Sequence, residues 1–267
     1  MKGVSRFKIA VCLVCAFTLC ACGRFAKSPF TGTWKTNLDQ SQFSSAPFTF
    51  SVSNGRYECA SCVPKIEVKA DGSDQPLSGL LHYTIAVNEI DSHTVRLVTK
   101  RDGKNFSEEI CTAAQGGRTL HVKTTNHLLE GDEPRMWEAE WARIGEFVPT
   151  GNAISGSWRM QTLRAPENEL LETFTERGSE LSVSSPIGTG WTAKFDGKAY
   201  PVKGSYETDS VSLKQVDDRT VEATYTLGRH LIRVDKITVS SDGNTLTTVS
   251  ESKQTGRVDT LFATKQK

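Results

Sequence analysis

The sequence has few features that would indicate a membrane-spanning or nucleic-acid-binding protein. Its one long apolar run, Ile9–Leu19, is shorter than the roughly 20 residues that a membrane-spanning helix needs. Met1–Cys22 carries Lys2, Arg6 and Lys8 and no acid, so the remaining chain has 29 basic and 31 acidic residues. The formal charge near −2 that follows from these counts provides no global field for nucleic acid.

Catalytic and metal-binding motifs are also missing. The histidines form no His-x-His or His-Glu-x-x-His pattern, the Cys-x-x-Cys motif has no second pair, and no Gly-x-Ser-x-Gly opens a helix. We interpret the histidines as solvated or rim residues, and four carboxylates that could form acid–base pairs as outward or turn residues: Glu138, Glu140, Asp217 and Asp218. We therefore predict a protein that is not an enzyme, without catalytic residues, metal or cofactor.

The N-terminus has the three parts of an export signal: a basic start, an apolar run and small residues before a cysteine. Leu19-Cys20-Ala21-Cys22 resembles a bacterial lipobox, which implies a signal peptide at 1–21, lipidation of Cys22, and a tether at 22–30. Because Gly23 follows the cysteine, we expect an outer-membrane lipoprotein that faces the periplasm. Ordinary cleavage, which would leave a soluble periplasmic protein, is the alternative.

Export leaves three cysteines in the folded part: Cys59, Cys62 and Cys111. Three is an odd number, so one disulfide and one free thiol is the simplest outcome in an oxidising envelope. We expect the bridge to include Cys59 or Cys62. Pairing with Cys111 is favoured by loop entropy, since the longer loop constrains the unfolded chain more, provided that the two strands are neighbours. A redox role for the Cys-x-x-Cys motif is disfavoured, because no helix follows it.

An internal repeat organises the rest of the chain. Gly32-Thr33-Trp34-Lys35 recurs as Gly156-Ser157-Trp158-Arg159, and four further matches follow in the same order at spacings of 121 to 126 residues. We therefore predict two copies of one domain, at 31–145 and 154–267, with a linker at 146–153 that contains Pro149 and Gly151.

Both copies have the pattern of antiparallel strands. Apolar residues alternate with polar ones in Thr- and Val-rich runs, and Asx-Gly turns recur every 8–12 residues, as at Asn54-Gly55 and Asp102-Gly103. We predict an all-β fold with eight to nine strands in each copy, closed into a barrel or packed as a sandwich, since a long open sheet would expose two edges.

The copies resemble small exported lipocalin-like proteins of the acidobacterial type. The resemblance is carried by Thr31-Gly32-Thr33-Trp34-Lys35-Thr36-Asn37 in copy one and by Phe195-Asp196-Gly197-Lys198-Ala199-Tyr200-Pro201 in copy two. It implies two tandem antiparallel barrels of the lipocalin or fatty-acid-binding kind, in which the tryptophan of Gly-x-Trp closes the base. The second lipocalin motif, Thr-Asp-Tyr, is absent, so a large ligand-holding calyx is not implied.

Two functions remain open at this point. Recurring aromatic residues could line a pocket for a small hydrophobic ligand, or they could fill the cores of two barrels that serve as an envelope scaffold. The sequence identifies no ligand-binding residue and no protein partner. Beyond the lipid anchor, the expected partners are a membrane and a small hydrophobic molecule, and not nucleic acid.

Overall fold

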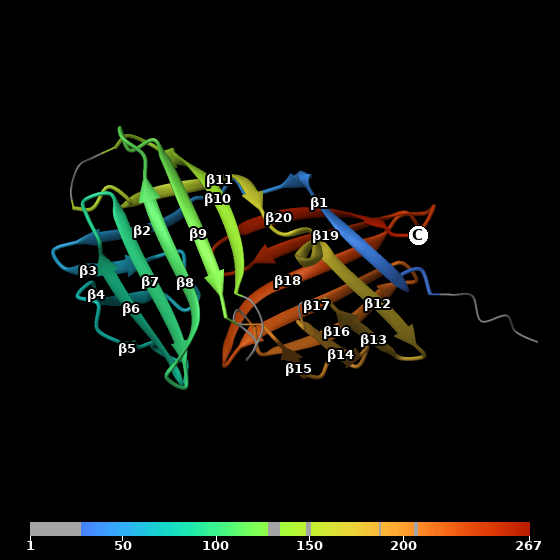
Figure 1. Cartoon of the computed structure of the whole chain (residues 1–267). Helices are drawn as coiled ribbons and strands as arrows, with labels where there is room; N and C mark the ends of the chain where they lie inside the picture. Colours follow the sequence, from blue (N-terminus) through green and yellow to red (C-terminus); the bar gives the residue numbers. More distant parts are fainter. Residues whose placement is uncertain (1–27, 128–133, 148–150, 187, 206–207) are drawn as a thin grey trace, which may run out of the picture.

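A computed structural model describes residues 28–127, 134–147, 151–186, 188–205 and 208–267. Twenty strands, all paired antiparallel, form two barrel-like sheets that lie side by side (Figure 1). One 3-10 turn, η1 (Glu167–Leu170), is the only helical element in this part of the chain. None of the described residues forms a helix that could span a membrane.

The sheet that we call the C-terminal barrel is closed. Its strands follow the order β1 (Gly32–Gln42), β12 (Leu171–Arg177), β13 (Glu180–Ser184), β14 (Gly190–Lys194), β15 (Tyr200–Lys203), β16 (Ser210–Asp217), β17 (Thr220–Leu227), β18 (His230–Val239), β19 (Thr245–Ser252) and β20 (Arg257–Lys265), which returns to β1. Closure leaves this sheet without an exposed edge.

The sheet that we call the N-terminal barrel also has ten strands. Their order is β4 (Ile66–Lys69), β3 (Arg56–Cys59), β2 (Phe48–Ser53), β11 (Gly156–Arg164), β10 (Arg135–Ile144), β9 (Thr119–Asn126), β8 (Lys104–Ala113), β7 (Thr94–Arg101), β6 (Tyr83–Glu89) and β5 (Gln75–Pro76). The two edge strands are joined by the Gln75 side chain, which accepts a hydrogen bond from the Lys69 N–H (2.8 Å) and donates one to its carbonyl (2.9 Å). The barrel is therefore nearly closed.

Local sequence explains most of the strand pairing. Asn54-Gly55 and Asp102-Gly103 connect β2 to β3 and β7 to β8, with φ between 49° and 78° at all four residues. Two consecutive residues of positive φ match the twist of a two-residue hairpin, and Asx-Gly adopts that conformation most easily. The all-β prediction is confirmed, although each barrel has ten strands rather than eight or nine.

The two repeats exchange their first strands. β1, which precedes the N-terminal barrel in sequence, lies between β12 and β20 of the C-terminal barrel. β11, the first strand of the second repeat, lies between β10 and β2 of the N-terminal barrel. Residues 43–47 and 165–170 therefore each cross from one barrel to the other (Figure 1).

This exchange corrects the expected domain boundaries. Two separate apolar cores are present, as two barrels require, but segments 31–145 and 154–267 do not each form one barrel. Trp34 belongs to the core of the C-terminal barrel and Trp158 to that of the N-terminal barrel. The physical reason is that the two first strands are near-equivalent, so either one completes either sheet.

The equivalence extends to the contacts of the two tryptophans. Trp34 Nε1 donates to the Phe30 carbonyl (2.8 Å), and Trp158 Nε1 donates to the Ile154 carbonyl (2.9 Å), 124 residues further along. Both indoles are buried, and each ring faces a cation, Lys265 at 4.8 Å from the ring centre of Trp34 and Arg143 Cζ at 4.1 Å from that of Trp158. Each exchanged strand thus brings a buried indole into the other repeat's core.

Candidate functional site

An apolar cavity of about 540 Å³ occupies the lumen of the N-terminal barrel. Its lining consists of inward-facing residues of that barrel together with three loop residues of the other: Phe48, Phe50, Tyr57, Leu97, Glu109, Cys111, Leu120, Val122, Thr124, Trp137, Ala139, Trp141, Met160 and Leu163, with Thr189, Gly204 and Ser205. Met160 and Leu163 lie on the exchanged strand β11. The cavity therefore depends on both repeats.

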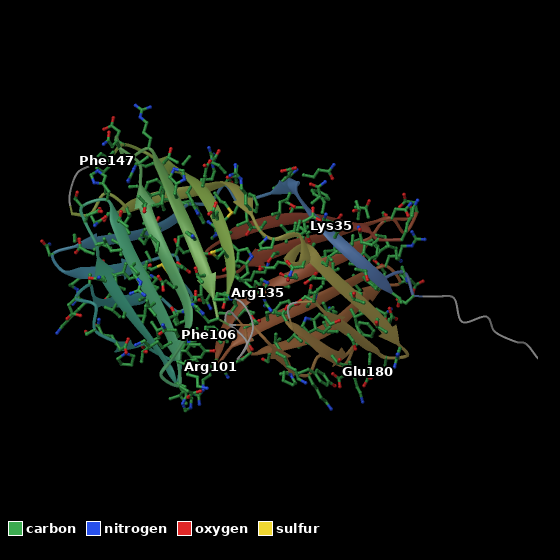
Figure 2. The ribbon with its side chains drawn as sticks, viewed as in Figure 1. Lys35, Arg101, Phe106, Arg135, Phe147 and Glu180 are labelled. Atoms are coloured by element: carbon green, nitrogen blue, oxygen red, sulfur yellow. A yellow bond between two sulfur atoms is a disulfide. The ribbon has the colours of Figure 1, made fainter. Side chains whose placement is uncertain are left out.

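A second cavity, of about 440 Å³, lies between the two barrels. Leu77, Tyr83 and Phe106 line it from the N-terminal barrel, and residues of β18, β19 and β20 line it from the C-terminal barrel. Phe106 lies at the end of the N-terminal barrel that faces the other barrel, whereas Phe147 lies at the opposite end (Figure 2). Phe48 lines both cavities, so they adjoin at its ring.

The C-terminal barrel carries larger side chains than the N-terminal barrel at three equivalent inward-facing positions. Equivalent strand pairs place Tyr225 opposite Arg233 in the C-terminal barrel and Thr99 opposite Ser107 in the N-terminal barrel. Trp191 of the C-terminal barrel corresponds to Ile66 of the N-terminal barrel. Trp191 is the register partner of Val183, and Ile66 is the register partner of the equivalent Cys59. Two of the smaller residues, Thr99 and Ile66, line the inter-barrel cavity, so the smaller side chains leave space at the end of the N-terminal barrel that faces the other barrel.

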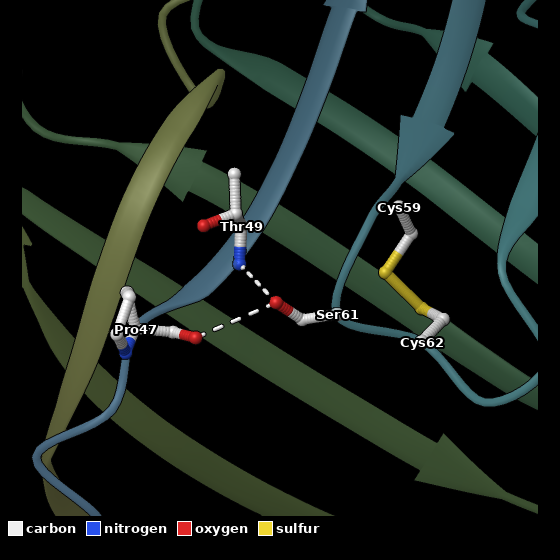
Figure 3. Close-up of a disulfide and its surroundings, with 5 residues drawn as sticks. All are labelled: Pro47, Thr49, Cys59, Ser61 and Cys62. Carbon is white, nitrogen blue, oxygen red and sulfur yellow. Dashed lines mark hydrogen bonds between the residues drawn. A yellow bond between two sulfur atoms is a disulfide. The ribbon is translucent and has the colours of Figure 1, made fainter. Parts of the chain in front are cut away.

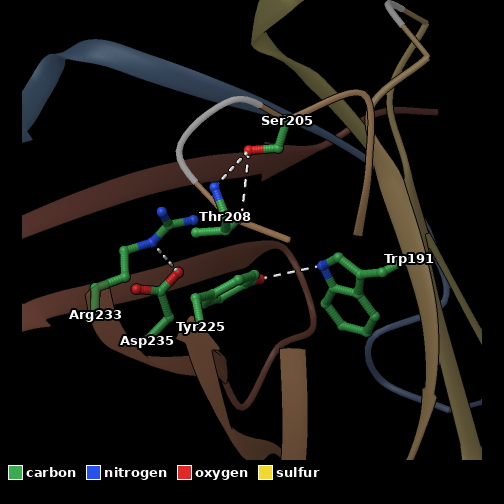
Figure 4. Close-up of polar contacts among 6 residues, drawn as sticks. All are labelled: Trp191, Ser205, Thr208, Tyr225, Arg233 and Asp235. Carbon is green, nitrogen blue, oxygen red and sulfur yellow. Dashed lines mark hydrogen bonds and ion pairs between the residues drawn. The ribbon is translucent and has the colours of Figure 1, made fainter. Parts of the chain in front are cut away.

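The large residues of the C-terminal barrel form a polar cluster in which Tyr225, Trp191 and Asp235 are buried and Arg233 is partly buried (Figure 4). Arg233 Nε donates to Asp235 Oδ2 (3.1 Å), and its guanidinium lies 4.3 Å from the ring centre of Tyr225. Trp191 Nε1 donates to the Tyr225 hydroxyl (3.2 Å). Burial and the nearby Asp235 carboxylate raise the pKa of Tyr225, so the phenol stays protonated at neutral pH.

Glu172 contributes a second carboxyl group to this cluster. It is the register partner of the buried Trp34, and its side chain is exposed to solvent. Desolvation raises its pKa most, Asp235 raises it further, and Arg233 opposes both. Desolvation, reinforced by the Asp235 carboxylate, therefore makes Glu172 hold its proton more tightly than a glutamate in water.

The polar groups in the apolar lumen are largely uncharged. Desolvation raises the pKa of the Cys111 thiol, and the Glu109 carboxylate raises it further. Burial and the same carboxylate raise the pKa of Tyr57. A protonated thiol is a weak nucleophile, because the thiolate is the reactive form. The lumen thus offers an apolar wall with few ionised groups rather than an activated catalytic residue.

The cysteine pairing differs from the expected one. Cys59 and Cys62 form a disulfide with their Cα atoms 5.4 Å apart (Figure 3). Cys111 is a buried free thiol. Between the two half-cystines, Ser61 Oγ accepts a hydrogen bond from the Thr49 N–H (2.9 Å). The expectation that the bridge includes Cys59 or Cys62 is confirmed, but the favoured pairing with Cys111 was wrong. Strand β8, which carries Cys111, is separated from β3 by four strands, so the two cysteines are not neighbours.

The other candidates lie outside both cavities. His82, His93, His121 and His127 are exposed and His230 is partly buried, and the carboxylates Glu138, Asp217 and Asp218 are exposed, with Glu140 partly so. Cys22 lies outside the described residues. Four charged residues of the two barrels were not predicted from the sequence as site residues: Glu109, Glu172, Arg233 and Arg257. Glu109 and Asp235 occupy equivalent inward-facing positions of the two barrels, 126 residues apart. This match between the repeats could have identified both carboxylates from the sequence.

Comparison of the chain with family models, with curated proteins and with solved structures gave no match.

Proposed function

We propose that the protein is a non-enzymatic binding protein whose N-terminal barrel holds a small hydrophobic molecule. The apolar cavity of about 540 Å³ supports this proposal, because ligand pockets occupy roughly 300–1,000 Å³ and are lined mainly by apolar and aromatic side chains with a few polar groups. Its walls combine Phe48, Phe50, Trp137 and Trp141 with Tyr57 as a polar contact. We retain the lipocalin-like resemblance as part of this proposal.

A scaffold without ligand is the second candidate. The filled interior of the C-terminal barrel, with its Tyr225, Arg233 and Trp191 side chains, favours such a role for that half of the molecule. Both observations are accommodated if the two barrels have different roles. The N-terminal barrel then binds the ligand, and the C-terminal barrel covers one end of the N-terminal lumen with Thr189, Gly204 and Ser205.

Filling the lumen is expected to abolish ligand binding. Ala139 is buried on β10 with its side chain at the cavity, so Ala139→Trp places an indole where the ligand would lie. We expect the affinity for N-phenyl-1-naphthylamine, an uncharged apolar fluorophore, to fall by about tenfold or more, as the loss of a 1.4 kcal/mol contact would produce. Fluorescence titration measures the effect.

The control for this variant is Met136→Trp on the same strand, because Met136 is 50% exposed and is absent from the cavity lining. It is expected to bind like the unchanged protein. A melting curve for each variant separates lumen filling from unfolding, and Val122→Trp on β9 provides a second blocked lumen. Unchanged binding in both folded lumen variants would contradict the proposed site.

We further propose that the protein is anchored through Cys22 to the outer membrane and faces the periplasm. Several acyl chains hold a protein on a membrane far more firmly than one chain does. Cys22→Ser is therefore expected to abolish labelling with radioactive palmitate and to move the protein from the membrane fraction to the soluble fraction. Labelling at the level of the unchanged protein would show that the lipobox interpretation is wrong.

A further inference from the structure

Arg257 places a cation where the two cavities adjoin. It begins β20 of the C-terminal barrel, and its guanidinium lies over two rings of the N-terminal barrel, 5.5 Å from the ring centre of Phe48 and 6.0 Å from that of Trp141. Phe48 lines both cavities, Trp141 lines the lumen, and Arg257 lines the inter-barrel cavity. A molecule in the lumen that extends past Phe48 therefore meets this guanidinium.

No carboxylate of the described residues pairs with Arg257. Its Nη1 donates to the Ala46 carbonyl (3.0 Å), and this contact leaves most of its five N–H groups available. Asp259 lies two residues along the same strand, but its Oδ1 accepts the Ser44 N–H (2.7 Å) and it forms no ion pair with Arg257. Arg233, the other guanidinium of the inter-barrel cavity, is held by Asp235. Among the described residues of this junction, Arg257 is thus the guanidinium whose N–H groups remain available to a ligand.

Two further donors beside Arg257 are buried without a hydrogen-bond partner in the described part of the chain. They are the indole Nε1 of Trp141 and the hydroxyl of Ser252. Ser252 is the register partner of Arg257 across β19 and β20, and it lines the same cavity. An indole N–H and a guanidinium can only donate, and a buried donor without an acceptor costs free energy. The group that complements this junction is therefore rich in acceptors.

We propose that the ligand is an amphiphile with a single anionic head group, a carboxylate or a phosphate ester, which binds at Arg257 while its apolar chain occupies the lumen. The proposal rests on the proposed function and specifies its ligand class. A charge-assisted hydrogen bond from a guanidinium to such a head group is stronger than one to a neutral carbonyl. The head group binds the C-terminal barrel and the chain binds the N-terminal barrel, so only the assembled pair of barrels forms the complete site.

Displacement of N-phenyl-1-naphthylamine from the full chain tests this assignment. Three competitors share one chain length and differ in head group: dodecanoate, dodecyl phosphate and dodecanol. We expect at least one anion to compete about tenfold better than dodecanol, and Arg257→Gln to remove this preference, since a hydrogen bond to a charged group is worth roughly that factor. The stronger anion identifies the head group. The preference is the ratio of anion to dodecanol competition measured within one variant, so a change of fluorophore affinity in Arg257→Gln cancels from it.

Arg219→Gln is the matched control. Arg219 also donates from Nη1 to a backbone carbonyl, that of Ser240 (3.1 Å), but it is absent from both cavity linings. Its replacement is expected to leave the preference for anions unchanged. Equal competition by anions and dodecanol, or a preference that survives Arg257→Gln, would overturn the head-group assignment while the apolar site stands. Absence of fluorophore binding to the unchanged protein would instead overturn the proposed function.

Discussion

Cutting the chain between the two repeats is expected to leave one particle rather than two. A protease site inserted after Phe147 separates a fragment that carries β1 from one that carries β11. In the structure each of these strands lies inside the sheet of the other fragment, paired on both sides. Separation therefore requires two strands to leave two barrels, with a buried tryptophan exposed in each. Burial of such a side chain contributes about 1.5–3 kcal/mol before backbone pairing is counted.

Size-exclusion chromatography of the cut protein measures this outcome. The cut protein should elute with the uncut one, whereas a denaturing gel of the same fraction should show two bands. Treatment with urea before the column provides the control for two fragments that can come apart. Two separate native peaks, each of half size, would show that each repeat folds on its own first strand and would contradict the strand exchange.

The repeat and the strand pattern could be predicted from the sequence, but the exchange of first strands between the barrels could not. Alternation and Asx-Gly turns are local properties, so hairpins such as the one at Asn54-Gly55 could be predicted. The choice between β1 and β11 for a given slot is not local. Phe30 with Trp34 and Ile154 with Trp158 make the same contacts, so the sequence does not distinguish an exchanged pair of barrels from an unexchanged one.

The candidate site was partly visible in the same alternation. In the run from Leu231 to Val239, Arg233 and Asp235 fall on the same face as the buried Ile237 and Val239, which points into the C-terminal barrel, and Arg233 lines the inter-barrel cavity. The cavity itself was not predictable, because it depends on how side chains of several distant strands fill a common space. The favoured bridge from Cys59 or Cys62 to Cys111 was wrong for a related reason: it required neighbouring strands, and sheet order is a property of the whole fold.

The effect of the strand exchange on the stability of each barrel can be measured by the labelling rate of a single thiol, that of Cys111. In a protein that begins after Cys22, Cys111 is the one cysteine outside the Cys59–Cys62 bridge, and it is buried in the N-terminal barrel. A thiol reagent reaches it only when that barrel opens, so the labelling rate reports the local free energy of opening. No other cysteine of this shortened chain competes for the reagent.

We expect the labelling rate of Cys111 to respond to replacement of Trp158, in the other repeat, far more than to replacement of Trp34, in its own repeat. Trp158→Ala removes a buried indole from the N-terminal barrel and should cost about 3–5 kcal/mol, which speeds Cys111 labelling by roughly a hundredfold or more. Trp34→Ala removes the equivalent indole from the C-terminal barrel and should leave labelling within a few-fold of the unchanged rate. Without strand exchange, the residue nearer to Cys111 in its own repeat, Trp34, would instead control the thiol. Labelling with Ellman's reagent, with melting curves to show that both variants are destabilised, therefore reports which tryptophan belongs to which barrel.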